Sequence, residues 1–166
     1  MSDERLDAVD HRILTALDRD GEVDAEALAE TLEVSQSTIY YRLEKYRERG
    51  IVRGQTVDID RHSLGLDMTA VTEIETVYGP ESRTVGEQLE ALSGVRQVYA
   101  MLGESSFLLL SHVRDHDHLQ RLVERIIEIE GVEDSTTHIV LRTFKEESRL
   151  LVNYDDADLE QIFDIE

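Results

Sequence analysis

The sequence predicts an α+β protein of two domains: an N-terminal winged helix-turn-helix followed by a ferredoxin-like βαββαβ domain. Apolar residues recur at helical spacing up to residue 50, and from Gly65 they alternate with polar residues as in a half-buried strand. After Gly65 the segments follow the order strand, helix, strand, strand, helix, strand. A short basic segment at residues 35–54 also interrupts an otherwise acidic chain.

Three short helices are expected before residue 50. The first covers residues 6–20 and ends at Gly21, because glycine commonly terminates helices. Asp24 can cap the second helix, and Ser35 begins a third that runs to Gly50. A tight turn between the second and third helices is typical of a helix-turn-helix. The core positions expected in the third helix are Ile39, Leu43 and Tyr46.

The expected domain boundaries follow from these changes of pattern. Residues 1–57 form the winged helix-turn-helix, with a β wing at 51–57, and residues 58–64 form a hinge. Residues 65–145 form the ferredoxin-like domain. Its strands are expected at 65–75, 95–101, 107–113 and 136–144, and its helices begin at Pro80 and at Asp115 or Asp117.

The predicted sheet has one open face. Because both helices lie on one side of the four strands, the other side is bare, and a second copy of the chain is its simplest cover. We therefore expect a homodimer, with tetramers and octamers left open.

Residues 146–166 form an acidic C-terminal tail whose apolar residues are sufficient for a strand or helix that docks.

Composition excludes several classes of protein. The chain has no cysteine, which excludes disulfides, thiol catalysis and cysteine-ligated zinc. It contains no apolar run of about 18 residues, the length that a membrane span requires. The first ten residues are polar and acidic, unlike a secretory signal. The expected location is the cytoplasm.

The net charge of −20 is unusual for a protein that meets nucleic acid. Lys45 and Lys145 are the only lysines, against 37 acidic residues, and this balance resembles proteins of extreme halophiles. In molar salt the Debye length is only about 3 Å, so only charges in direct contact matter. Composition alone leaves open an acidic protein that never meets DNA. The five basic and two acidic residues of 35–54 favour DNA binding.

The N-terminal half of the third helix is the part that would enter the major groove. Gln36 suits adenine, Arg42 suits guanine or phosphate, and hydroxyl groups suit either. Tyr40 and Tyr41 point about 100° apart on a helix, so at least one is expected to face DNA. The predicted DNA-binding residues are Ser35, Gln36, Ser37, Thr38, Tyr40, Tyr41, Arg42, Lys45, Arg49 and Arg53.

Signals for catalysis or metal binding are weak. Residues 115–118 contain two aspartates and two histidines, but only Asp115 and His118 share a helix face. A helix start with capping acids explains this cluster more simply than a metal site. We expect no enzyme activity, no metal and no cofactor.

With these motifs in order, the chain resembles the leucine-responsive regulator/AsnC (Lrp/AsnC, feast/famine) family over residues 6–145. The family's recognition-helix pattern matches Ser35, Thr38, Ile39, Arg42 and Leu43, and its Gly-[Val/Ile]-Ile-x-Gly segment matches residues 50–54. The resemblance implies a transcriptional regulator that binds double-stranded DNA as a dimer or larger assembly. It also implies control by a small-molecule effector such as an amino acid.

The resemblance places the effector near a turn between two strands. Gly103 and Phe107 match the family's Gly-x-x-Asp-[Tyr/Phe] pattern, but Ser106 stands where the family has aspartate. Loss of a carboxylate that could hold an ammonium group weakens the case for an amino acid. The expected effector residues are Tyr99, Met101, Gly103, Glu104, Ser105 and Ser106.

Two alternative functions stay open. In the first, the chain is a sensor or assembly module with vestigial DNA binding, which ion pairing of Arg42, Lys45 and Arg49 would favour. In the second, it resembles siroheme decarboxylases, which share the two-domain layout and need basic residues for tetrapyrrole carboxylates. Residues 55–166 hold few basic residues among many acids, and we expect no compact basic-plus-histidine cluster there.

Overall fold

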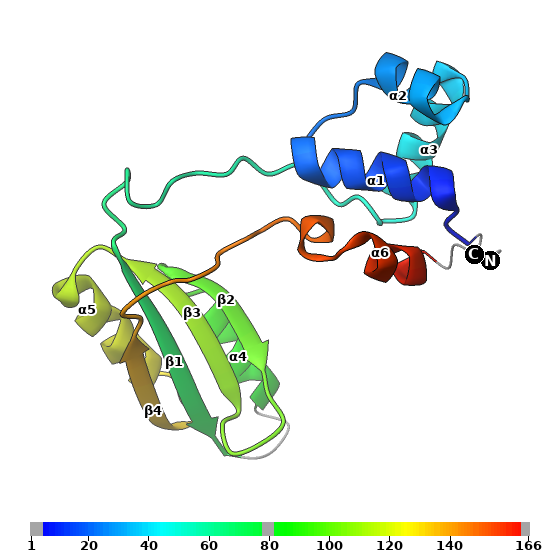
Figure 1. Cartoon of the computed structure of the whole chain (residues 1–166). Helices are drawn as coiled ribbons and strands as arrows, with labels where there is room; N and C mark the ends of the chain where they lie inside the picture. The colour runs from blue at the N-terminus through cyan, green and yellow to red at the C-terminus, as the bar shows by residue number, and fades with distance from the viewer. Residues whose placement is uncertain (1–4, 78–81, 164–166) are drawn as a thin grey trace. The chain divides into compact units, whose positions relative to one another are not determined.

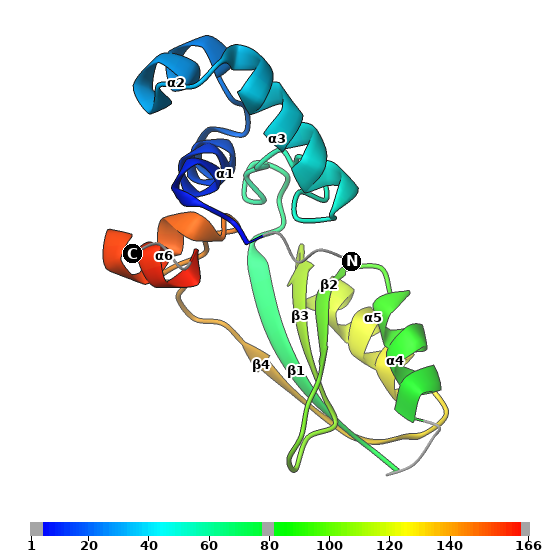
Figure 2. The same cartoon turned by 90° about the vertical axis from the view of Figure 1, so that its right-hand side faces the viewer.

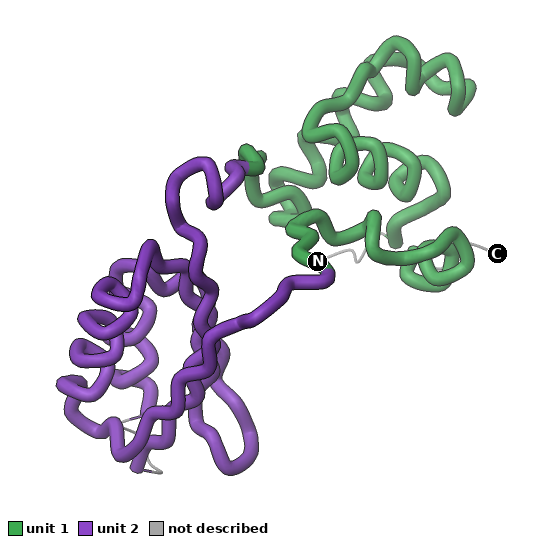
Figure 3. The backbone as a smooth tube through the Cα atoms, turned by 60° about the vertical axis from the view of Figure 1, so that its left-hand side comes forward, with its two compact units in different colours: residues 1–58, 145–166 green, residues 59–144 purple. Residues whose placement is uncertain are grey.

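The computed structural model describes residues 5–77 and 82–163, and the chain divides into two compact units (Figures 1 and 3). Unit 1 comprises residues 1–58 together with 145–166, and unit 2 comprises residues 59–144. None of the described helices is long and apolar enough to cross a membrane.

Unit 1 begins with three helices, α1 (Ala8–Asp20), α2 (Ala25–Leu32) and α3 (Gln36–Glu48). The predicted caps are confirmed, since the side chain of Asp24 accepts backbone N–H groups of α2 and that of Ser35 accepts one of α3. Gly21 ends α1 with a φ of 75°, a conformation that favours glycine. As predicted, Ile39 and Tyr46 are buried in the core of this unit, and Leu43 packs against it partly buried.

The predicted β wing is wrong. Residues 51–57 form no strand in the structure, and residues 53–60 have no regular secondary structure. The backbone N–H groups of Ile51 and Val52 instead donate to the carbonyl of Tyr46, at 2.9 and 3.2 Å, which closes the end of α3. A strand needs a partner, and the described part of unit 1 offers none.

The C-terminal tail folds onto the helix-turn-helix and belongs to unit 1. It forms a 3₁₀ helix, η1 (Leu151–Asn153), and α6 (Asp156–Ile162). The carboxylate of Asp18 on α1 accepts three consecutive backbone N–H groups at residues 150–152, at 3.1, 2.7 and 3.4 Å. Leu159 and Phe163 then bury their side chains among the residues of α1–α3.

Unit 2 is a four-stranded antiparallel sheet with two helices on one face (Figure 2). The strand order is β2-β3-β1-β4, and the β-α-β-β-α-β sequence order confirms the ferredoxin-like prediction. The core between sheet and helices is centred on Ile74, Leu109 and Ile126. The elements are β1 (Met68–Thr76), α4 (Ser82–Glu90), β2 (Val95–Ala100), β3 (Phe107–Val113), α5 (His116–Ile127) and β4 (Val132–Ile139).

Two predicted strands have different ends. The strand expected at 136–144 runs from Val132 to Ile139, because regular pairing with β1 ends at Ile139 opposite Ala70 and continues only as one hydrogen bond, from the Val140 N–H to the Thr69 carbonyl at 2.9 Å. Likewise the strand expected from Gly65 begins at Met68, since Gly65 lies in a turn with a φ of 72°. The predicted helix start at Pro80 lies outside the described residues.

Candidate nucleic-acid interface

The first half of α3 presents polar and aromatic side chains to solvent. Gln36 and Ser37 are exposed, and Tyr40 and Tyr41 each leave 62% of their surface accessible. The opposite side of the helix holds Ile39, which is fully buried. Two neighbouring exposed tyrosines bury little of their apolar area within the domain, so this face is available to a partner.

Hydroxyl groups order the first turn of α3. The Ser35 Oγ accepts the backbone N–H of Thr38 at 3.1 Å and lies 2.7 Å from the Ser37 Oγ and 2.8 Å from the Thr38 Oγ1. This network holds the start of the helix in one conformation. The predicted hydroxyl cluster at Ser35, Ser37 and Thr38 is therefore brought together, and Gln36 lies within the same turn.

Arg42, which was predicted to contact DNA, forms ion pairs within its own domain in this structure. Its guanidinium donates to both carboxylate oxygens of Asp7, at 2.7 and 2.8 Å, and to Asp10 at 2.6 Å. The Arg42 side chain is only 24% exposed and that of Asp10 only 9%. These contacts join α3 to the start of α1, so Arg42 is a positioning residue in this structure.

Asp10 is the centre of this network. It accepts the Tyr46 hydroxyl and the backbone N–H of Asp7, the latter at 2.8 Å. Burial, together with the hydrogen bond to Asp10, raises the pKa of Tyr46. Partial burial opposes ionisation of Asp7, but the Arg42 guanidinium and the hydrogen bonds with Asp10 together lower the pKa of Asp7. This cluster was not predicted from the sequence, although Asp7 and Asp10 stand at the start of the first helix.

The remaining cations of this region are held more loosely. The Lys45 Nζ contacts Glu48 at 2.7 Å and lies 5.6 Å from the centroid of the Tyr41 ring. Both side chains of that ion pair are more than 40% exposed, and exposed pairs contribute only about 0–1 kcal/mol. Arg49 and Arg53 are exposed. Arg42 is thus more deeply enclosed by its partners than Lys45, whose side chain is 41% exposed.

The predicted effector residues gather around the loop between β2 and β3. The backbone N–H of Ser106 donates to Ile74 at 2.8 Å, and its Oγ accepts the N–H of Thr76 at 3.1 Å. The Ser105 Oγ donates to a carboxylate oxygen of Glu73 at 2.8 Å. Glu73 therefore places a carboxylate beside the loop, which was not predicted from the sequence. Of the other predicted residues, Tyr99, Met101, Gly103 and Glu104 are exposed.

The expectation that residues 55–166 lack a compact basic-plus-histidine cluster is wrong. Arg114, His118, Arg121 and Arg125 line one cavity on α5. They are spread over twelve residues, and only the helix brings them onto one face. The described residues include no group of three or more histidine, cysteine or acidic side chains arranged to hold a metal ion. Asp115 caps α5 by accepting the N–H of His118 at 2.8 Å.

The sheet face opposite α4 and α5 carries apolar side chains. The register places Val71 opposite Leu110, and Tyr99 opposite Leu108. Val71, Leu108 and Leu110 are partly exposed, and Tyr99 is 49% exposed. Adjacent apolar residues on an open sheet face are typical of an interface rather than of a solvated surface.

Comparison with known protein families matches both units. Residues 6–47 match the AsnC-type helix-turn-helix domain, and residues 69–150 match the Lrp/AsnC ligand-binding domain. An uncharacterised HTH-type transcriptional regulator of Pyrococcus horikoshii is 32% identical over 87% of this chain and 97% of its own length. The HTH-type transcriptional regulator FL11 of Pyrococcus abyssi is 30% identical, over 87% of this chain and 95% of its own.

Solved structures show the same architecture. E. coli AsnC superposes with a TM-score of 0.78 at 29% identity, covering 83% of this chain and 93% of its own. A Neisseria meningitidis transcriptional regulator in complex with L-Met gives a TM-score of 0.80 at 25% identity, covering 89% and 97%. A feast or famine regulatory protein of M. tuberculosis complexed with L-methionine gives 0.75 at 27% identity, covering 86% and 97%.

Proposed function

Since the chain belongs to the Lrp/AsnC family of helix-turn-helix transcriptional regulators, we propose that it binds specific DNA sites through the exposed face of α3, as a homodimer in the cytoplasm. The observation that carries the α3 assignment is the accessible polar and aromatic surface of its first half, with Tyr40 and Tyr41 each 62% exposed. A helix-turn-helix inserts this part of its second helix into the major groove.

The contacts divide into two kinds. We expect Gln36, Tyr40 and Tyr41 to contact base edges or sugars, and Lys45, Arg49 and Arg53 to contact phosphates. Phosphate contacts position the protein, whereas base contacts select the sequence. Arg42 contributes indirectly, because it holds α3 against the start of α1.

Gln36→Ala and Tyr41→Ala are expected to weaken binding to the native site by about 5-fold to 100-fold each, as loss of about 1–3 kcal/mol per base contact implies. The measurement is fluorescence anisotropy with the upstream DNA of its own gene and a scrambled duplex, in roughly molar potassium chloride. Tyr154→Ala, in the C-terminal segment of the same unit, is the control; Tyr154 is 43% exposed.

Equal affinity for native and scrambled DNA would contradict sequence-specific binding. It would instead support the alternative of a sensing or assembly module with vestigial DNA affinity. The ion pairs of Arg42 and Lys45 favour this alternative, because paired cations are less available to phosphates. The Lys45–Glu48 pair is exposed, however, and such a pair opens at little cost in free energy. A loss of binding in Tyr154→Ala as large as in the α3 variants would show that the effect is not local.

The dimer is proposed to form through the open sheet face. Leu110→Asp places a charge among Val71 and Leu108, and is expected to shift the mass in light scattering toward the 19.0 kDa of one chain. Ile127→Asp, on α5 and 58% exposed, is the matched control and should leave the assembly unchanged. If Ile127→Asp dissociates the assembly and Leu110→Asp does not, the subunits pair through the helical face instead of the open sheet face.

We also propose control by a small metabolite at the 101–106 loop, without catalysis. The L-methionine complexes of the Neisseria and M. tuberculosis relatives support this role. Ser106 removes the carboxylate expected there, but the Glu73 carboxylate beside Ser105 supplies another that can bind an ammonium group. A purified protein without colour, and without optical change when porphyrin is added, is expected for a regulator and not for a tetrapyrrole enzyme.

A further inference from the structure

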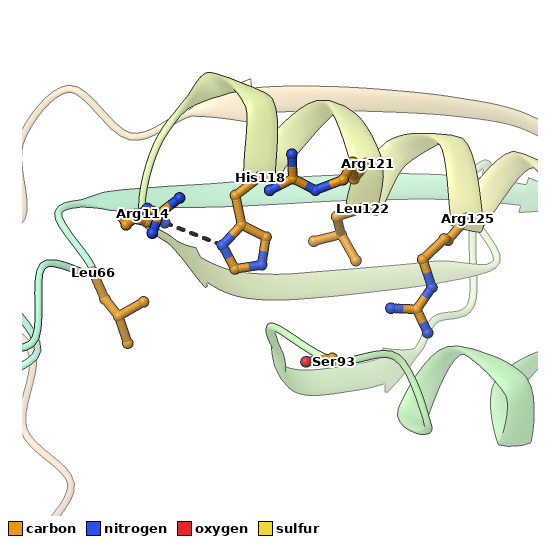
Figure 4. Close-up of a pocket in the computed structure, with 7 residues that line it drawn as sticks. All are labelled: Leu66, Ser93, Arg114, His118, Arg121, Leu122 and Arg125. Carbon is orange, nitrogen blue, oxygen red and sulfur yellow. Dashed lines mark hydrogen bonds between the residues drawn. The ribbon is translucent and has the colours of Figure 1, made fainter.

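A cavity in unit 2 gathers basic side chains along one face of α5 (Figure 4). Its volume of about 450 Å³ is in the range of pockets that hold organic ligands. Arg114 lies just before the helix, and His118, Arg121 and Arg125 lie on it. The spacing of three and four residues places the helical members on a single stripe.

The remaining walls of the cavity are neutral. Leu66 and Leu122 are apolar, with Leu122 only 2% exposed, and Ser93 contributes the loop before β2. Among the described residues, no carboxylate lines the cavity. This is the reverse of the chain as a whole, in which 37 acidic residues outnumber 17 basic ones.

The cations of this cavity have few partners in the protein. The Arg114 Nε donates to Asp115 at 2.8 Å, and the same carboxylate attracts Arg121 at longer range, but within residues 5–77 and 82–163 neither Arg121 nor Arg125 forms an ion pair. Neighbouring positive charges repel one another. Guanidinium groups present paired N–H donors that match two oxygens of a phosphate or carboxylate. An anionic ligand would relieve the repulsion and satisfy these donors.

His118 adds a directed donor. Its Nδ1 accepts the backbone N–H of Arg114 at 3.4 Å, which leaves Nε2 as the ring nitrogen that can donate. The loop at Gly94 lies against this ring, since a Cβ added to Gly94 would be in van der Waals contact with Nε2, at 3.4 Å. Gly94 has a φ of 94°, a conformation that disfavours a side chain. The histidine is therefore held between the helix start and the opposite wall.

We propose that this cavity binds an anionic organic metabolite with at least two phosphate or carboxylate groups, as a ligand site separate from the 101–106 loop. Arg114 and Arg125 lie at opposite ends of the cavity, so a second anionic group is needed to engage both (Figure 4). The leucine walls suit an organic body, and a duplex fits a concave site of this size poorly.

The test is isothermal titration calorimetry of the full-length protein with ADP, pyrophosphate, citrate and adenosine. ADP or citrate is expected to bind, and neutral adenosine is not. Tighter binding of ADP than of citrate identifies phosphate as the ligand group, and the reverse identifies carboxylate. Pyrophosphate binding as tightly as ADP would overturn the part of the proposal that assigns an organic body to the leucine walls.

Arg121→Ala and Arg125→Ala should each raise the dissociation constant by at least about tenfold, the effect of losing one charge-assisted hydrogen bond. Arg83→Ala is the matched control, because it removes the same charge from unit 2 at a side chain that is 88% exposed and paired with Glu87. It should change the constant by less than about twofold. The variants should retain the melting temperature of the native protein.

Three results would overturn the proposal. The first is absence of binding by every anion, and the second is an equal loss in Arg83→Ala, which would mean that only net charge matters. The third is a protein that binds no metabolite and in which Arg121→Ala weakens DNA binding or abolishes an absorbance shift with porphyrin. Loss of DNA binding would assign the basic side chains to DNA, and loss of the absorbance shift would assign them to a tetrapyrrole. The α3 variants test DNA binding separately, so failure of one proposal does not imply failure of the other.

Discussion

Replacing Arg42 with methionine will lower the stability of unit 1 by about 3–5 kcal/mol, because it leaves the buried Asp10 carboxylate without its countercharge. For a unit of this size the midpoint of thermal unfolding should fall by on the order of 10 °C or more. Differential scanning calorimetry of the full-length protein measures it. Asp10 retains the Tyr46 hydroxyl and the Asp7 N–H, which limit the loss but do not supply a positive charge.

The matched control for this variant is Arg47→Met. Arg47 lies on the same helix, pairs with Glu44 at 3.5 Å and is 60% exposed, so its loss should change stability by no more than about 0.5 kcal/mol. Adding Asp10→Asn to Arg42→Met should recover part of the loss, since the unpaired charge is then removed. An Arg42→Met protein with native stability and no DNA binding would instead restore the sequence prediction that Arg42 contacts DNA.

Replacing Phe163 with alanine will destabilise unit 1 by about 3–5 kcal/mol, the usual cost of removing a buried phenylalanine. Phe163 is 4% exposed, and its ring centroid lies 5.0 Å from that of His11 on α1. Burial, with a smaller contribution from Arg12, lowers the pKa of His11, so the histidine favours the neutral form against this ring. Chemical denaturation and hydrogen exchange of α1 should both report the loss.

Ile162→Ala provides the comparison, because Ile162 is the neighbouring residue on α6 and is 53% exposed. Its removal should cost no more than about 0.5 kcal/mol. Equal stability of Phe163→Ala and the native protein would mean that α6 does not pack on α1 in solution. The C-terminal tail would then be an acidic segment that does not dock.

Features governed by neighbouring residues were predicted well. The caps at Asp24 and Ser35 and the buried positions of α3 follow from spacing and side-chain chemistry within one helix. The alternation along β1 likewise predicted which side chains face the helices, with Ala70, Thr72 and Ile74 buried. Strand ends were predicted less well, because they depend on pairing with a distant strand: β4 stops at Ile139, where its register with β1 ends at Ala70.

The function of individual charged residues required the tertiary structure. Arg42 fits a DNA-contact pattern on its own helix, yet its partners Asp7 and Asp10 lie more than thirty residues earlier. The basic cluster on α5 was not predicted, because its members are separated in the sequence and the surrounding segment contains many acidic residues. Glu73 was not considered as an effector residue because only the pairing of β1 with β3 brings it to the loop.

The sequence by itself determined the fold class, the three helices of the helix-turn-helix and the βαββαβ order, since periodicity and capping are local properties of the chain. Only the tertiary structure decided that the tail completes the helical core, that residues 51–57 have no strand partner and that Arg42 is held by α1. These features depend on which distant segments meet, and burial and charge pairing at such contacts have no signature in any one segment.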